Sequence, residues 1–148
     1  MKTQIQKTSK DPRMEGMPWL MPYLTVRDPA KAISFYEKAF GFKKINSVQG
    51  EDGSLQHVEM KQEEAVIMFG PEGAYGGTAK APATSKVESG ISLYVYCRDV
   101  DARYEQAKAA GAEVVMELQD AFWGDRTCQF KDPDGYRWSF ATNLGFKK

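Results

Sequence analysis

The alternation of apolar and polar residues predicts one series of elements in the first half of the chain. A short segment rich in β-forming residues leads into a helix with one apolar stripe, and three strand-like segments follow. Asp28 suits the N-cap of this helix, Pro29 its first position and Gly41 its end. We expect the strands at residues 21–26, 43–48, 54–61 and 65–69.

The second half of the chain repeats this series. Tyr23 and Asp28 recur as Tyr94 and Asp99, at an offset of 71 residues. The second helix is expected at residues 100–110, and the strands at 91–97, 113–118, 125–131 and 136–142. Two copies of a module cannot form a solenoid, so the repeat indicates paired modules with a ligand cleft between or within them.

The pattern divides the chain into four segments. These are a polar N-terminal tail (1–18), a first βαβββ module (19–70), a flexible linker (71–90) and a second βαβββ module (91–143). The tail has no apolar core segment, so we do not interpret it as a secretory signal, and we expect it to be disordered or loosely docked. The linker is rich in Gly, Ala, Pro, Ser and Thr, and either closes over a cavity or only connects the modules.

Composition narrows the class of protein. The 148 residues, 42% hydrophobic and with zero net charge, suit one globular domain and argue against a general nucleic-acid binder. No apolar run is long enough for a membrane helix. The two cysteines, Cys97 and Cys128, form no CxxC motif, so we expect free thiols and a cytoplasmic location.

Several segments together resemble the vicinal oxygen chelate superfamily, which includes glyoxalase I, bleomycin-resistance proteins and extradiol dioxygenases. They are Val26-Arg27-Asp28 leading into Phe35-Tyr36, Gly41-Phe42, and residues 130–138 around an Asp-Pro-Asp-Gly turn. Residues 22–24 and 57–60 are also similar to its PhnB-like branch. The resemblance implies an α+β glyoxalase/bleomycin-resistance fold, in which two βαβββ modules form an open barrel-like trough. It also implies a homodimer that completes the cavity.

Enzymes of that superfamily hold a divalent metal with residues on the first and last strand of each module. The resemblance places those positions here at Met21, Met68, Ser92 and Ser139. Thioethers and hydroxyls are poor ligands for Zn, Mn, Ni or Fe(II), which prefer imidazole and carboxylate. We therefore expect neither the usual metal centre nor another cofactor.

Strand alternation indicates what lines the trough instead. Tyr23, Tyr94, Tyr96 and Arg137 share the face of the four former ligand positions, and the opposite face is more apolar, as a face under a helix should be. Trp123 precedes a strand and is a candidate for the cavity rim, although a surface turn explains it equally well. Aromatic rings and hydroxyls suit a planar or amphipathic organic ligand.

His57, the single histidine, and Glu59 are expected on the trough side of their strand. Three interpretations remain open. His57 is an ordinary strand residue, hydrogen-bonded or facing solvent, while Glu59 pairs with a nearby cation; or His57 is a catalytic base or ligand contact with Glu59 as its orienting carboxylate; or both are ligands of a displaced metal. Arg126 and Arg137 could hold a ligand carboxylate, but ion pairs within the protein are the simpler expectation. Cys128 follows His57 at the same 71-residue offset, which places it toward the trough, and we interpret it as a packing residue.

Two classes of function follow. The first is a protein without a metal that binds or sequesters a small aromatic or amphipathic compound. The candidate ligand-binding residues are Met21, Tyr23, His57, Met68, Ser92, Tyr94, Tyr96, Trp123, Arg137 and Ser139. The alternative is a metal-dependent lyase, isomerase or dioxygenase with a non-standard site around His57 and Glu59. A cofactor-free enzyme or a stress protein is a third option, so the sequence leaves open whether any reaction is catalysed.

Overall fold

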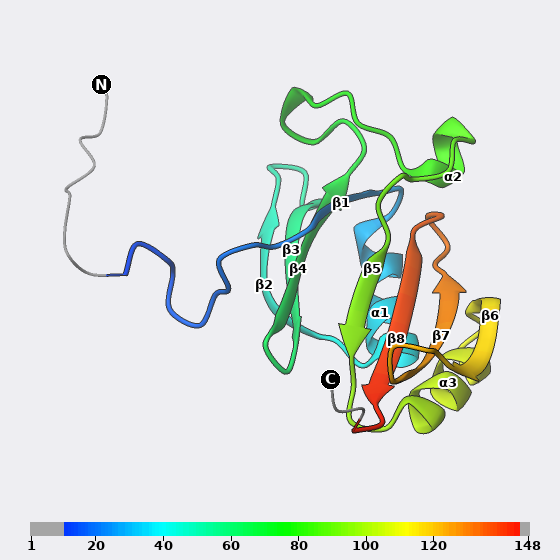
Figure 1. Ribbon diagram of the computed structural model, residues 1–148. Helices are drawn as coiled ribbons and strands as arrows, with labels where there is room; N and C mark the ends of the chain where they lie inside the picture. The colour runs from blue at the N-terminus through cyan, green and yellow to red at the C-terminus, as the bar shows by residue number, and fades with distance from the viewer. Residues whose placement is uncertain (1–10, 146–148) are drawn as a thin grey trace.

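The computed structural model describes residues 11–145, and in them two four-stranded sheets flank a pair of helices (Figure 1). The first ten residues of the expected tail lie outside the described part. The first module comprises β1 (Tyr23–Val26), α1 (Pro29–Phe40), β2 (Lys43–Gln49), β3 (Leu55–Gln62) and β4 (Ala65–Pro71). The second comprises β5 (Leu93–Tyr96), α3 (Val100–Ala109), β6 (Glu113–Asp120), β7 (Asp125–Lys131) and β8 (Arg137–Asn143).

The two sheets have the same topology. Their strand orders are β1-β4-β3-β2 and β5-β8-β7-β6, and in each the first strand pairs in parallel with the last strand of its module. The other strand pairs are antiparallel. This is the α+β fold of two βαβββ modules that the sequence predicts, and the sheets remain open.

The residues expected to begin and end the helices do so. The Asp28 carboxylate accepts a hydrogen bond from the backbone N–H of Lys31 at 3.2 Å, and Asp99 accepts one from Ala102 at 3.1 Å. Gly41 ends α1 in the left-handed conformation, with φ at +77°. No helix among residues 11–145 has both the length and the apolar character needed to cross a membrane.

The segment between the modules holds more structure than its composition predicts. It contains a turn of 3₁₀ helix, η1 (Ala74–Gly76), and a short helix, α2 (Pro82–Ser85). The backbone N–H of Ala83 donates to the carbonyl of Asp134 at 2.9 Å, which docks α2 on the turn between β7 and β8. A tertiary contact of this kind has no signature in local composition, so the sequence did not reveal it.

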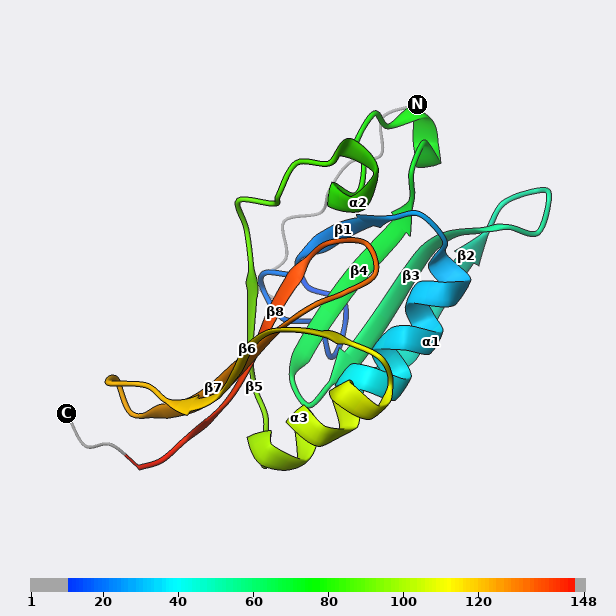
Figure 2. The ribbon, with the colours of Figure 1, turned by 90° about the vertical axis from the view of Figure 1, so that its right-hand side faces the viewer.

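One apolar core serves both modules. The inner faces of the two sheets and the apolar sides of α1 and α3 form a single buried cluster. Tyr36 of α1 lies 5.6 Å from Phe69 of the first sheet and 5.2 Å from Trp138 of the second, between ring centroids. Figure 2 shows α1 across one face of the first sheet, with α3 beside its end. The helix therefore packs on both sheets at once.

Polar contacts around the Asp-Pro-Asp-Gly turn join the modules as well. The buried Asp132 accepts a hydrogen bond from the Tyr36 hydroxyl at 2.6 Å, and Asp134 pairs with Arg27 at 3.1 Å. The Tyr136 hydroxyl donates to the backbone carbonyl of residue 25 at 2.8 Å. The Asp-Pro-Asp-Gly turn, part of the sequence motif that carries the family resemblance, thus holds the two modules together.

Candidate functional site

The candidate residues lie on the outer faces of the two sheets, opposite the shared core. The aromatic residues among them are about half exposed: 52% for Tyr23, 47% for Tyr94, 59% for Tyr96 and 47% for Trp123. Tyr23 lies on β1 of the first sheet, whereas Tyr94 and Tyr96 lie on β5 of the second sheet and Trp123 lies just before β7. The candidates therefore form two separate groups, which we call the first and second clusters.

The first cluster consists of Tyr23, His57 and Glu59, on β1 and β3 of the first sheet. The Tyr23 hydroxyl lies 3.0 Å from Nδ1 of His57, and Nε2 of His57 lies 3.1 Å from Oε1 of Glu59. Partial burial raises the pKa of Tyr23, and the nearby Tyr75 adds to the rise. In the tautomer that donates Nε2–H to Glu59, Nδ1 accepts a hydrogen bond from the Tyr23 hydroxyl. The order of groups is that of a carboxylate–imidazole–hydroxyl proton relay.

Glu59 is the least solvated member of the first cluster. The residue is 5% exposed, and its Oε2 has no hydrogen-bond partner among the described residues. An unpaired buried oxygen of a carboxylate is costly, and such atoms are found where a ligand or water completes the site. Without a catalytic role, Glu59 is expected to pair with a nearby cation, but the partner that the structure gives it is His57. This pairing has the geometry expected of a base with its orienting carboxylate.

The four former ligand positions do not fit a divalent metal in this structure. Met68 lies between Tyr23 and Glu59 in the strand register, and Ser139 accepts a hydrogen bond from Gln129 at 3.1 Å. Met21 and Ser92 lie just before β1 and β5, and the set offers only thioether and hydroxyl donors.

A displaced metal site finds little support around His57. Both of its ring nitrogens are engaged, one by Tyr23 and one by Glu59. Among residues 11–145, no three His, Cys, Asp or Glu side chains gather in a group able to hold a metal ion.

The second cluster surrounds Asp125 at the start of β7. This carboxylate is 1% exposed, and its Oδ2 accepts hydrogen bonds from Tyr94 at 2.6 Å, Tyr96 at 2.8 Å and Trp123 at 3.2 Å. Its Oδ1 accepts a fourth from the side chain of Asn143 at 2.9 Å. These bonds, that of Tyr94 above all, lower the pKa of Asp125, although burial acts the other way.

Asp125 and Asn143 are residues of this cluster that sequence reasoning missed. An aspartate at the start of a strand resembles an ordinary turn residue, which hides a role in binding. The signal that could have found it is strand alternation, since Asp125 shares a face with Thr127 and Gln129, opposite the buried Cys128 and Phe130.

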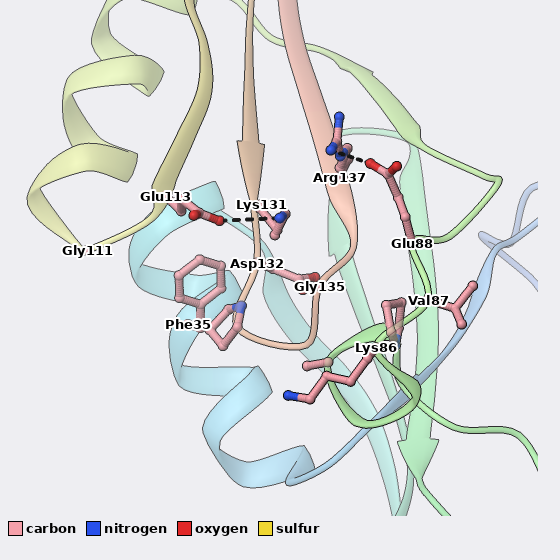
Figure 3. A pocket seen from close by; sticks show the side chains of 13 residues that line it. Phe35, Lys86, Val87, Glu88, Gly111, Glu113, Lys131, Asp132, Gly135 and Arg137 are labelled. Atoms are coloured by element: carbon pink, nitrogen blue, oxygen red, sulfur yellow. Dashed lines mark ion pairs between the residues drawn. The ribbon is translucent and has the colours of Figure 1, made fainter.

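The two arginines are held by ion pairs within the protein. Arg126 pairs with Asp101 and with Asp120, each at 3.0 Å. Arg137 pairs with Glu88 beside an open hollow of about 710 Å³, lined also by Phe35, Lys86 and Lys131 (Figure 3). The hollow surrounds the turn between β7 and β8, so Arg137 stands apart from both clusters.

The expected orientation of Cys128 is wrong. Its side chain is fully buried in the core. Cys128 pairs with Phe140 in the second sheet as Val58 pairs with Phe69 in the first, so Cys128 corresponds to Val58 and not to His57. The offset between the modules is therefore 70 residues at this strand, and the 71-residue offset assigned the residue to the opposite face. Burial raises the pKa of its thiol to about 11, consistent with a packing role.

Comparison with known proteins identifies the family. A model described as the Glyoxalase/Bleomycin resistance protein/Dioxygenase superfamily matches residues 16–140. The uncharacterized protein Mb0911c of Mycobacterium bovis is 38% identical over 124 residues, which cover 82% of this chain and 81% of that protein. The uncharacterized protein YetH of Bacillus subtilis is 29% identical over 111 residues, or 74% of this chain and 85% of YetH.

Solved structures share the same arrangement of modules. TioX from Micromonospora sp. ML1 superposes with a TM-score of 0.68 at 26% identity, over 84% of this chain and 98% of that chain. A superfamily member from Sphaerobacter thermophilus, at 22% identity over 82% of this chain and 93% of its own, shares the fold with a TM-score of 0.65. The matched region covers the first module and the second as far as residue 140, and the chain belongs to the Glyoxalase/Bleomycin resistance protein/Dioxygenase superfamily.

Proposed function

We propose that this protein binds a small aromatic or amphipathic compound, without a metal at the usual positions of its superfamily. The observation that carries the proposal is that the exposed aromatic rings are held in fixed orientations by hydrogen bonds. Tyr23, Tyr94, Tyr96 and Trp123 present ring surface to solvent while hydrogen bonds to His57 or Asp125 hold their polar ends in place. Rings fixed in this way lose little entropy when a ligand stacks on them.

We further propose that two copies of the chain complete each site. In one chain the two clusters lie on different sheets and their rings remain about half exposed, so neither encloses a ligand alone. A twofold dimer that sets the first cluster of one copy against the second cluster of the other would form two equivalent clefts. The exposure of Trp19, Leu20 and Ile91, at 73%, 86% and 75%, next to β1 and β5 supports a contact on this side. The two free thiols support a cytoplasmic location for the protein.

The Tyr23–His57–Glu59 chain favours a second candidate, a cofactor-free enzyme that uses Tyr23 for proton transfer. As Nδ1 of His57 takes the phenolic proton, the Tyr23 oxygen takes a proton from an acidic group of the bound compound, so that no free phenolate, which the raised pKa of Tyr23 disfavours, has to form. Glu59 holds the other ring nitrogen and stabilises the imidazolium that forms. This role needs no metal, whereas a metal-dependent enzyme would need donors that the described residues do not supply.

Three measurements on the purified full-length chain test the binding function. Light scattering should give the mass of a dimer, and a thermal-shift screen of neutral and charged aromatic compounds should raise the melting temperature with at least one of them. Elemental analysis of protein prepared without chelator tests the metal. One tightly bound divalent ion per chain, or no stabilisation by any aromatic compound, would overturn the proposal.

Substitution at the first cluster distinguishes the two candidates. If the protein only binds, His57→Gln should leave affinity for a stabilising compound within about threefold of the original and no turnover should be lost. If it catalyses proton transfer, the same variant should lose solvent-deuterium exchange into the bound compound. Tyr104→Phe, a change in a ring of α3 that packs against Phe130 of the second module, is the matched control.

A further inference from the structure

The second cluster has the geometry of a corner built from aromatic ring faces. The rings of Tyr94 and Tyr96 lie 5.7 Å apart at 73°, and those of Phe122 and Trp123 lie 5.0 Å apart at 90°. The polar ends of Tyr94, Tyr96 and Trp123 all converge on one oxygen of Asp125. Their faces are consequently the part left open to a ligand.

The charge at the centre of this corner is not balanced within the described chain. Asp125 is ionised at neutral pH, because hydrogen bonds lower its pKa, and all its donors are neutral groups. Among residues 11–145, no Lys, Arg or His forms an ion pair with it. A buried charge without a counter-charge attracts a cation from outside.

The same hydrogen bonds decide what kind of cation can approach. Oδ2 already accepts three bonds and Oδ1 one, so the carboxylate has little capacity left for a small metal ion that must coordinate oxygen directly. A phenol that donates to a carboxylate has its ring enriched in electrons, which strengthens its attraction for a cation over the face. A large, weakly hydrated organic cation can use those faces.

We propose that the second cluster binds the positively charged end of an organic ammonium compound. Tyr94, Tyr96 and Trp123 contact its apolar substituents, and Asp125, at the polar ends of these rings, supplies the compensating charge. The inference rests on the proposed binding function and specifies the chemical class of its ligand. It predicts that charge, at constant shape, decides which aromatic compounds bind tightly.

An isosteric pair of probes tests this prediction. Trimethyl(4-hydroxyphenyl)ammonium and 4-tert-butylphenol have nearly the same shape and differ by one positive charge. Isothermal titration calorimetry on the full-length protein should show the ammonium compound binding roughly tenfold tighter, and the indole N–H of Trp123 should shift in NMR spectra on its addition. Equal affinity, or tighter binding of the neutral phenol, would overturn the inference and leave the proposed function standing.

Two variants localise the effect. Asp125→Asn keeps the size of the side chain and should reduce the preference for the ammonium compound to about threefold or less. Asp120→Asn makes the same change of net charge at an exposed ion pair and should leave the preference unchanged. A preference that survives Asp125→Asn, or is lost equally in Asp120→Asn, contradicts the assignment.

Tyr96→Leu provides a second test of the site in case the Asp125→Asn variant does not fold. Tyr96 is 59% exposed, so its replacement leaves the core intact while removing one wall of the corner. We expect at least fivefold weaker binding of the ammonium compound, and an unchanged affinity would refute the role of the ring. If neither probe binds but neutral aromatic compounds still stabilise the protein, the inference fails and the proposed function does not. Failure of all aromatic compounds overturns both.

Discussion

Replacing Asp132 is expected to destabilise the protein more than an ordinary surface substitution. Its carboxylate accepts four hydrogen bonds, from the side chains of Tyr36 and Trp138 and from the backbone of Asp134 and Tyr136. Tyr36 is 1% exposed and Trp138 is fully buried, so neither donor can turn to solvent instead. Asp132→Ala leaves both of them without an acceptor.

The magnitude follows from the two orphaned donors. Each unsatisfied buried group costs about 1–3 kcal/mol, and the two backbone donors of the turn add to this. Removal of a carboxylate whose pKa is raised by burial returns part of its desolvation cost, so we expect a net loss of about 3–5 kcal/mol. Asp132→Asn keeps one acceptor oxygen and should cost about half as much.

Urea unfolding followed by tryptophan fluorescence measures these losses at neutral pH and fixed protein concentration. Asp52→Ala is the control and should cost less than about 1 kcal/mol, since among residues 11–145 the side chain of this turn aspartate accepts hydrogen bonds from the exposed Ser54 alone. Adding Tyr36→Phe to Asp132→Ala removes one of the two unpaired donors. The double variant should therefore be about 1–2 kcal/mol more stable than the sum of the two single losses predicts. A cost of Asp132→Ala below about 1 kcal/mol, at an unchanged denaturant slope, would refute the reasoning.

Three further outcomes can be checked on single variants or on the unmodified protein. Gly135→Ala should cost about 1–2 kcal/mol more in urea unfolding than Gly111→Ala, because both have positive φ but only at Gly135 would the new Cβ meet rigid neighbours, the Pro82 ring at 2.9 Å and the backbone nitrogen of Ala83 at 3.1 Å; equal costs would refute this. Neither Cys97 nor Cys128 should react quickly with Ellman's reagent at pH 8 until urea is added, because burial raises both thiol pKa values; fast reaction of the native protein would contradict it. The pKa of Asp125 is lowered in the folded protein, so its contribution to stability is present above the ordinary value of 3.8 and is lost as the pH falls below that value. The difference in melting temperature between the original protein and Asp125→Asn should therefore shrink in acid. A constant difference would contradict the hydrogen bonding of the ionised carboxylate.

The sequence predicted most of the secondary structure because the determining signals are local. Asp28 and Gly41 act through bonds and dihedral angles within a few residues, and strand alternation separates the buried Phe69 and Trp138 from the exposed Tyr23. The ends of strands differ by one or two residues, since fraying and pairing partners set them.

The contacts within the candidate site could not be predicted from such local signals. Tyr23 and His57 are 34 residues apart, and they meet only because β1 and β3 both flank β4 in the sheet. Asp125 gains its partners from three separate segments, so no short pattern marks it. The assignment of Cys128 failed because a slip of one residue between repeats moves a side chain to the other face of a strand.

The position of α1 also determines how the two halves of the chain depend on each other. Its Tyr36 and Phe40 fill space in front of Trp138 and Phe140, which belong to the other half of the sequence. A fragment that ends in the segment between the modules would expose the rings of Tyr36 and Phe40 to water. The remaining fragment would lack α1, the helix that covers the indole of Trp138. Neither piece is expected to be stable by itself, but the two should reassemble when mixed, so a chain cut within residues 71–90 would report, through recovery of its fold, whether its two parts are present together.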